Sequence, residues 1–278
     1  MGGLIVHWHG RLGFPMFTDS HCHLSFPELA ANLPEIRQAM AVANVGRALC
    51  ICTTLEEFSS VHDLSRYAEF WATAGVHPDN EGVKEPSIDD LLALGRLPRV
   101  VGIGETGLDY YRLGERTVAD MGWQRDRFRT HIRAARQLGL PLVVHSRSAS
   151  DDTLAILREE GETGGTGSAG GVFHCFTESA AVARVALDMG FFISFSGILT
   201  FKSAHEMRAV AQFVPFDRLL IETDSPYLAP SPHRGKVNNP SFVPLVAASL
   251  AELRGCKLED IAEITNRNFE TLFKRVLQ

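Results

Sequence analysis

The sequence predicts an α/β protein that folds as a single-domain (β/α)8 barrel, the TIM-barrel architecture, over residues 16–278. Eight short apolar runs carry this prediction, because each ends in a polar residue and is followed by an amphipathic stretch. The runs start about 20 to 42 residues apart, which leaves room for a strand, a helix and two loops each time. They are nearly continuous in apolar residues, which is typical of parallel strands covered on both faces. A doubly wound open sheet is the rival architecture, but its first turn is often Gly-rich, whereas this chain has Ser20-His21-Cys22-His23 there.

The individual elements follow from these runs in chain order. The strands are expected at 17–21, 47–52, 70–76, 99–104, 141–145, 171–175, 190–195 and 218–223. The longest helix is expected at 122–138, where Phe128 and Ile132 share one face and Gly139 ends the pattern. Further helices are expected at 179–189, 203–213, 240–254 and 258–276. The segment 109–121 is expected to be a loop, and the Gly-rich 161–171 a flexible connection without the spacing of a phosphate-binding loop.

Composition narrows the class of protein. Of 278 residues, 45% are hydrophobic and 22% charged, which excludes a disordered chain, a collagen and a coiled coil. The net charge is −6, so the chain lacks the strongly basic character that is typical of a nucleic-acid binder. A polyanionic substrate would therefore have to be held by a local basic cluster or by metal ions. No apolar run is long enough for a membrane span. Five cysteines, odd in number and in apolar runs, favour a reducing, cytoplasmic location. Residues 1–15 fit neither a signal peptide nor a structural element, and we expect an N-terminal extension before a true start at Met16.

Chemistry-bearing side chains gather where the predicted strands end. In a barrel these ends open onto one face, which is where active sites lie. His21 and His23, two apart on one strand, point the same way. The His21 and His23 pair alone could equally be buried or loop residues without a metal, and His145 or His174 alone would be read as a core histidine. The candidates on this rim are the five histidines His21, His23, His77, His145 and His174, with Glu105 after the fourth strand and Asp224 after the eighth.

This donor set predicts a metal-dependent hydrolase. Neutral imidazole and carboxylate suit divalent ions such as Mg²⁺, Mn²⁺ or Zn²⁺. The six candidate ligands are His21, His23, Glu105, His145, His174 and Asp224. They exceed what one tetrahedral ion needs, so we expect two ions bridged by one carboxylate. Glu105 is the expected bridge, because Gly104 and Gly107 allow a close approach. Two ions roughly 3.5–4 Å apart lower the pKa of a bound water, which points to hydrolysis by hydroxide.

The sequence resembles a known family, the TatD family of metal-dependent deoxyribonucleases in the amidohydrolase superfamily. Seven motifs between Met16 and Phe273 carry the resemblance: Asp19-Ser20-His21-Cys22-His23-Leu24, Gly75-Val76-His77-Pro78, Gly104-Glu105-Thr106-Gly107-Leu108-Asp109-Tyr110, Val144-His145-Ser146-Arg147, His174-Cys175-Phe176-Thr177, Ser194-Phe195-Ser196-Gly197 and Glu222-Thr223-Asp224-Ser225-Pro226-Tyr227-Leu228. Pro232-His233-Arg234-Gly235-Lys236 resembles the YcfH-type branch.

The resemblance implies a TIM barrel and a two-metal centre. It places His21, His23, Glu105 and Asp224 around one ion, and Glu105, His145 and His174 around the other. Glu105 takes the place of the carboxylated lysine that bridges the metals in many superfamily relatives. The implied activity is that of a nuclease, commonly a 3′→5′ exonuclease on DNA, and some relatives act on RNA or on aminoacyl-tRNA esters.

In the expected mechanism, hydroxide held between the ions attacks a terminal phosphodiester. Asp224 accepts the proton of the nucleophile, and Asp224 and Glu105 are the catalytic residues. Glu222 either orients the metal ligands or forms a salt bridge at the edge of the core. His77 either donates to the phosphate or is a structural histidine before Pro78.

The expected substrate contacts lie on the rim. Arg147, Arg234 and Lys236, with Arg112 and Lys202, either bind phosphate or are solvated surface charges. Tyr110, Tyr111 and Phe201 either stack on bases or pack the loops. The expected partner is DNA, single-stranded or at 3′ ends, acted on by a monomer away from membranes. Two alternatives stay open, an ester or amide hydrolase such as an aminoacyl-tRNA deacylase and a non-catalytic metal-binding barrel.

Overall fold

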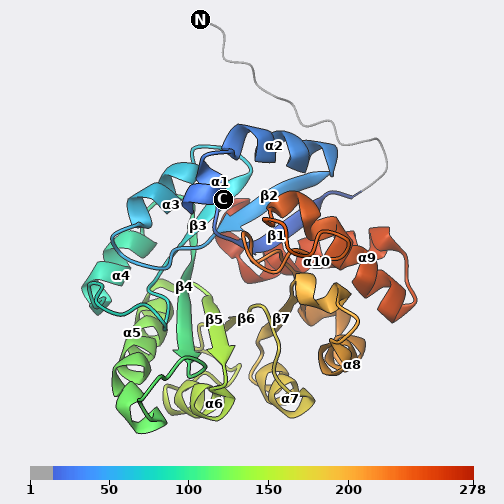
Figure 1. Cartoon of the computed structure of the whole chain (residues 1–278). Coiled ribbons are helices and arrows are strands. Elements are labelled where there is room, and N and C mark those ends of the chain that lie inside the picture. Colours follow the sequence, from blue (N-terminus) through green and yellow to red (C-terminus); the bar gives the residue numbers. More distant parts are fainter. Residues whose placement is uncertain (1–14) are drawn as a thin grey trace, which may run out of the picture.

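The computed structural model describes residues 15–278, which form one eight-stranded parallel sheet in the order β1 to β8. The strands are β1 (Phe17–Cys22), β2 (Val45–Cys50), β3 (Phe70–Ala74), β4 (Val100–Asp109), β5 (Leu142–Arg147), β6 (Gly171–Phe173), β7 (Phe192–Phe195) and β8 (Leu219–Ile221). Figure 1 shows helices ringed around these strands. The predicted TIM barrel is therefore confirmed. The expected extension at 1–15 falls, apart from Pro15, outside the described residues.

The helices cover the outside of the barrel. They are α1 (Pro27–Ala30), α2 (Leu33–Val42), α3 (Phe58–Leu64), α4 (Ile88–Gly95), α5 (Gly122–Leu138), α6 (Ser150–Glu159), α7 (Ala180–Asp188), α8 (His205–Phe213), α9 (Val243–Arg254) and α10 (Leu258–Leu272). Short 3-10 helices are η1 (Val118–Met121), η2 (Gly197–Thr200), η3 (Phe216–Arg218), η4 (Pro240–Phe242) and η5 (Lys274–Leu277). α5 has the predicted bounds, and it ends where Gly139 adopts a left-handed conformation.

Two strand boundaries differ from the prediction in a way that matters for the site. β2 begins and ends two residues earlier than expected, at Val45–Cys50. β4 continues to Asp109, because its second half pairs with β5 as far as Arg147. The prediction that Glu105 follows the fourth strand is therefore wrong, since Glu105 lies within β4 at an irregularity in the pairing between Ile103 and Thr106.

The barrel closes between β8 and β1 at their carboxyl ends. The Asp224 N–H donates to the His21 carbonyl at 3.0 Å, and the His23 N–H donates to the Ser225 carbonyl at 2.8 Å. Asp19 adds a buried side-chain link, because its carboxylate accepts from the Thr223 N–H at 2.9 Å and from the Thr223 hydroxyl at 2.6 Å. Closure thus fixes three candidate metal ligands relative to one another.

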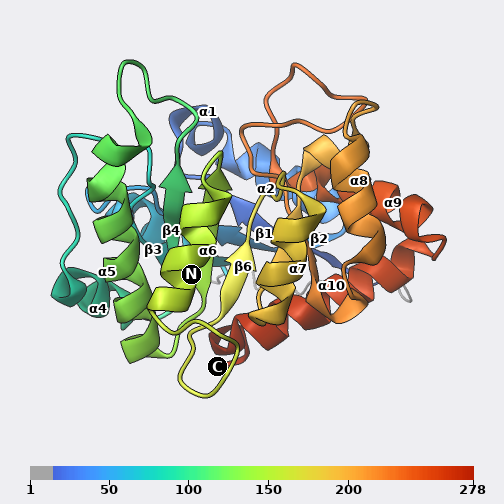
Figure 2. The ribbon, with the colours of Figure 1, turned by 90° about the horizontal axis from the view of Figure 1, so that it is seen from below.

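The two faces of the barrel carry different loops. Figure 2 shows the green loop after β4 and the orange loop after β8 rising on one side, with the yellow-green Gly-rich loop on the other. That Gly-rich loop is pinned by the buried carboxylate of Glu162, which accepts from the N–H groups of Ala169 and Gly170. It is therefore a closed loop on the far side from the site.

The barrel interior is filled below the site. Inward-facing residues such as Leu49, Val101 and Val143 are fully buried and pack with Phe269 of α10 and with Phe273, which directly follows that helix. The interior is thus a packed core that leaves the chemistry to the carboxyl ends of the strands. In residues 15–278 no helix is both long and apolar enough to cross a membrane.

Candidate metal centre

Four donor atoms converge at the mouth of the barrel, from β1 and the residue that follows it, from β4 and from the segment after β8. His21 Nε2 lies 3.3 Å from His23 Nε2, 3.3 Å from Glu105 Oε2 and 3.6 Å from Asp224 Oδ1. His23 Nε2 lies 3.8 Å from Glu105 Oε2 and 3.4 Å from Asp224 Oδ1. These four atoms, hereafter the first quartet, gather around His21 Nε2 and His23 Nε2, each of which lies within 3.8 Å of both carboxylate oxygens.

A second group surrounds the other oxygen of Glu105. Glu105 Oε1 lies 2.7 Å from His174 Nε2 and 3.1 Å from His145 Nδ1. The two histidine nitrogens are 3.4 Å apart. The carboxylate of Glu105 therefore turns one oxygen to each group, which is the arrangement expected of a bridge.

Both groups have dimensions that suit a divalent ion. A metal about 2.0–2.2 Å from each nitrogen or oxygen donor holds neighbouring donors roughly 3–3.6 Å apart. The donor separations around both oxygens of Glu105 lie in or close to this range. The His/Glu clusters are thus suited to binding two metal ions, and the structure brings all six predicted ligands together.

Two carboxylates outside the six donors orient the histidines of the second group. Asp109 Oδ2 lies 3.0 Å from His145 Nε2, and Glu222 Oε1 lies 3.3 Å from His174 Nδ1. A carboxylate that holds one ring nitrogen as N–H leaves the lone pair of the other nitrogen for a metal. Glu222 lies where the orienting interpretation requires. Asp109 was not predicted, although Glu105, Gly107 and Asp109 would share one face of a strand that continued past Glu105.

His77 reaches the same site but presents a proton. Its Nε2 lies 3.4 Å from Glu105 Oε1, while its Nδ1 accepts a hydrogen bond from the Asp79 N–H at 3.0 Å. Because Nδ1 is the acceptor, Nε2 carries the hydrogen in the neutral ring. Burial lowers the pKa of His77 to about 3, so the ring stays neutral. His77 has the spacing of a metal ligand with Glu105 and His145, but its neutral ring turns the Nε2–H, a hydrogen-bond donor, toward the site.

The electrostatics of the site favour ionised carboxylates. Burial alone would raise the pKa of Glu105, but the charge of the adjacent His174 and a hydrogen bond to His145 hold that pKa well below its usual range. Burial likewise acts against the ionised form of Asp224, yet hydrogen bonding to His23 lowers the pKa of Asp224. Both residues are therefore carboxylates at neutral pH, which is the form that binds a cation.

Glycines allow β4 to approach β5 closely enough to build the second group. A Cβ at Gly107, where φ is +126°, would lie 2.0 Å from the His145 carbonyl oxygen. A Cβ at Gly104, where φ is +150°, would lie 2.6 Å from the Val143 carbonyl oxygen. The close approach that the sequence predicted at these glycines is thus a structural requirement.

The predicted substrate-binding cations lie around the mouth without contacting the donors. Arg147 ends β5 with its guanidinium 3.7 Å above the centroid of the Tyr111 ring, and Arg234 lies 4.2 Å above the Phe201 ring. Lys236 is exposed in the loop after β8. Within residues 15–278 none of these three cations makes a hydrogen bond or ion pair with the six donors.

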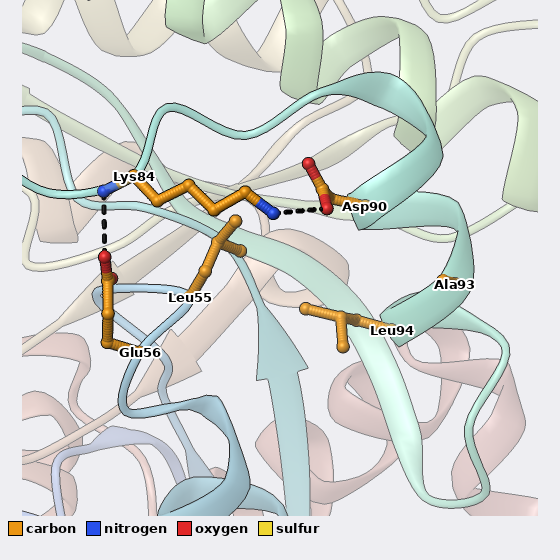
Figure 3. A pocket seen from close by; sticks show the side chains of 6 residues that line it. All are labelled: Leu55, Glu56, Lys84, Asp90, Ala93 and Leu94. Carbon is orange, nitrogen blue, oxygen red and sulfur yellow. Dashed lines mark hydrogen bonds and ion pairs between the residues drawn. The ribbon is translucent and has the colours of Figure 1, made fainter.

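Two hollows lie outside the donor cluster. One, of about 280 Å³, lies against α4 and is lined by Leu55, Glu56, Lys84, Asp90, Ala93 and Leu94. Figure 3 shows Lys84 tied through its N–H to Glu56 and through its ammonium to Asp90, so its charge is already paired. The other, of about 460 Å³, lies beside the loops after β4, β5 and β6 and includes Tyr110, Ser148, Asp152 and Glu178.

Comparison with known proteins gives consistent matches over nearly the whole described chain. Residues 18–274 match the family described as TatD related DNase, and this segment contains all six donors. The chain is 45% identical over 261 residues to the uncharacterized metal-dependent hydrolase YcfH of Escherichia coli K12, covering 92% of this chain and 95% of that protein.

A relative with a named activity and a relative with a solved structure match this chain at lower sequence identity. The chain is 32% identical over 262 residues to the 3'-5' ssDNA/RNA exonuclease TatD of Klebsiella pneumoniae, covering 92% of this chain and 97% of that protein. The crystal structure of YjjV, a TatD homologue from Escherichia coli K12, has a TM-score of 0.84 at 30% identity and covers 93% of this chain and 98% of that one.

Proposed function

The chain belongs to the TatD-related DNase family of metal-dependent hydrolases, and from this premise we propose that it is a phosphodiesterase that removes nucleotides from the 3′ end of single-stranded DNA. The observation that carries the proposal is the position of Glu105, whose two oxygens face two separate groups of donors. The similarity to the 3'-5' ssDNA/RNA exonuclease TatD of Klebsiella pneumoniae supports single-stranded DNA as the substrate and leaves RNA as a second candidate.

In the proposed mechanism the protein supplies ligands, a proton acceptor and a proton donor. His21, His23, Glu105 and Asp224 would hold one divalent ion, and Glu105, His145 and His174 the other. Such a pair of ions supplies a deprotonated water at neutral pH and neutralises charge on the phosphate. Asp224, whose Oδ1 belongs to the first quartet, accepts the proton of the attacking water.

The remaining residues hold the reacting groups in place. Asp109 and Glu222 fix the rings of His145 and His174, so that the ligand nitrogens keep their lone pairs toward the site. His77 donates its Nε2 hydrogen to a phosphate oxygen. This donation is available because burial keeps the His77 ring neutral and the Asp79 N–H occupies its Nδ1.

The rim contributes contacts to the rest of the strand. We propose that Arg147, Arg234 and Lys236 bind successive phosphates, which a chain of net charge −6 cannot attract by its overall field. Arg147 and Arg234 lie over aromatic rings, and stacked guanidinium groups keep their N–H edges free for phosphate oxygens.

All five cysteines are free, which supports a reducing compartment such as the cytoplasm.

The test uses manganese-loaded protein and a 5′-labelled single-stranded oligonucleotide. A 3′ exonuclease shortens the labelled strand by one nucleotide at a time, and this ladder is the expected result. Glu105→Ala and Asp224→Ala should abolish the ladder. Glu263→Ala, which removes an exposed carboxylate of α10, is the matched control and should cleave like the wild type.

Three outcomes would contradict the proposal. Equal cleavage by the wild type and Asp224→Ala would identify a contaminating nuclease. Release of the label as a mononucleotide would show attack from the 5′ end. Hydrolysis of an aminoacyl ester without cleavage of the oligonucleotide would favour an ester hydrolase, since the same ligands serve both reactions.

A further inference from the structure

Two aromatic side chains stand beside the first quartet, each three residues after one of its donors. Phe26 follows His23, and its ring stacks on the His23 imidazole with centroids 4.7 Å apart and planes at 17°. Tyr227 follows Asp224, and its ring meets Phe26 edge to face at 6.4 Å and 74°. We call Phe26 and Tyr227 the aromatic corner.

The two rings differ in how much of their surface remains free. His23 covers one face of Phe26, which is partly buried. Tyr227 is 54% exposed, which is unusual for a large aromatic residue beside a buried polar site. The exposed part of the Tyr227 ring is therefore available for stacking.

The backbone that presents Tyr227 is held rigidly although its side chain is exposed. The fully buried Asn238 donates from its amide nitrogen to the Tyr227 carbonyl at 2.6 Å and to the Thr223 carbonyl at 2.9 Å. The Asn238 N–H also donates to the Pro226 carbonyl at 3.0 Å. These bonds clamp the backbone segment that carries Asp224 and Tyr227, so the point from which the Tyr227 side chain extends is fixed relative to the first quartet.

We propose that the aromatic corner binds the base of the 3′-terminal nucleotide, with Tyr227 as the stacking platform and Phe26 as the side wall. The inference rests on the proposed function, because it assigns a contact to the substrate of that same site. A phosphate held at the first quartet brings its own nucleotide within reach of residues three positions away in the chain. Stacking on one aromatic face tolerates every base, so the corner recognises that a terminal base is present and not which base it is.

This position explains how the enzyme would act at an end. A base that stacks in the corner orders the sugar and the phosphate next to it, and such ordering favours in-line attack. A terminal nucleotide has no further strand to accommodate beyond the corner. The corner therefore acts as a positioning element for the scissile nucleotide.

The test compares two oligonucleotides that differ only at the 3′ terminus. One ends in an ordinary nucleotide and the other in a tetrahydrofuran abasic residue. With manganese-loaded wild type we expect kcat/KM to be about 5- to 150-fold higher for the ordinary end, which corresponds to roughly 1–3 kcal/mol per stacked base. Tyr227→Leu should lower kcat/KM for the ordinary end to the abasic level and leave the abasic value unchanged. Phe26→Leu should do the same to a smaller extent.

Phe216→Leu is the control, because it removes a part-exposed aromatic residue at the opposite, amino end of β8. It should keep the wild-type preference. Equal kcat/KM for both ends in the wild type overturns the proposal, and so does a Tyr227→Leu variant that loses the same factor on both substrates. An unchanged melting temperature of Tyr227→Leu is confirmed before the kinetics are measured. Tyr227→Phe, which keeps an aromatic ring, should retain the higher kcat/KM for the ordinary end.

Failure of the corner can be separated from failure of the nuclease function. Calorimetric titration of the manganese-loaded protein with dAMP and with deoxyribose 5-phosphate measures the base contribution without cleavage. One outcome would support the base-binding role of the aromatic corner and refute the nuclease function. In that outcome no oligonucleotide is cleaved, the wild type binds dAMP more tightly than deoxyribose 5-phosphate, and Tyr227→Leu binds both with equal affinity. Equal affinity for both ligands overturns the corner whatever the catalytic result.

Discussion

His77 and His145 lie against the same oxygen of Glu105, yet the structure assigns them opposite roles, and His77→Ala tests that assignment. The His77 Nε2 carries a hydrogen because the Asp79 N–H occupies Nδ1. The His145 Nδ1 carries a lone pair because Asp109 holds Nε2. His77→Ala should therefore keep both metal ions and lose one hydrogen bond to the phosphate.

The magnitude follows from that bond. A hydrogen bond to a charged group contributes about 1.5–3 kcal/mol, so kcat/KM should fall by about 10- to 150-fold. Metal content by mass spectrometry and kinetics on the labelled oligonucleotide are measured on the same preparation. His145→Ala is the comparison and should lose about one metal equivalent. If His77→Ala loses an ion as readily as His145→Ala does, or keeps full activity, the assignment from the Asp79 hydrogen bond is refuted.

Three further predictions concern orientation, packing and pH. Asp109→Asn and Glu222→Gln should each weaken metal binding by about 10- to 100-fold in competition with a chelator, and unchanged affinity would contradict their orienting role. Gly107→Ala should destabilise the fold by more than about 3 kcal/mol in urea unfolding, because its Cβ would strike the adjacent strand, whereas the matched Gly114→Ala, with open space around it, should cost about 1 kcal/mol. Burial lowers the pKa of His131 to about 4 from 6.5 in the unfolded chain, so the unfolded state binds the proton first and stability falls as pH drops from about 6.5 to 4. Between pH 7 and pH 4, the free energy of unfolding of His131→Gln should fall by about 3 kcal/mol less than that of the wild type, and an equal fall would refute this account.

Much of the fold was predictable because each barrel unit repeats the same physical pattern. An apolar run followed by an amphipathic stretch identifies a strand and its covering helix wherever it occurs, and α5 was predicted to the residue. Strand ends were less predictable, because a strand continues for as long as a neighbour offers backbone partners. β4 extends to Asp109 because β5 extends to Arg147, and neither limit is visible in either segment alone.

The same reasoning separates the donors from the residues that orient them. His21, His23, His145, His174 and Asp224 were predictable because strand ends meet at one face of any such barrel. Asp19 was not singled out, since its role depends on the closure of β8 against β1, where it binds Thr223. Its link acts between positions 204 apart in the chain, so no local pattern reports it.

The choice of ring nitrogen shows why register decides chemistry. His174 turns Nε2 to the site because Glu222 holds its Nδ1, whereas His145 turns Nδ1 to the site because Asp109 holds its Nε2. Asp109 reaches His145 only because β4 and β5 pair with Gly107 opposite His145 and Asp109 opposite Arg147. A slip of one residue would turn Asp109 to the other face of the sheet and leave His145 without its orienting carboxylate. The residue types at the site are therefore a property of the sequence, but the atoms that they offer are a property of strand register, and Gly107 is the position that allows that register.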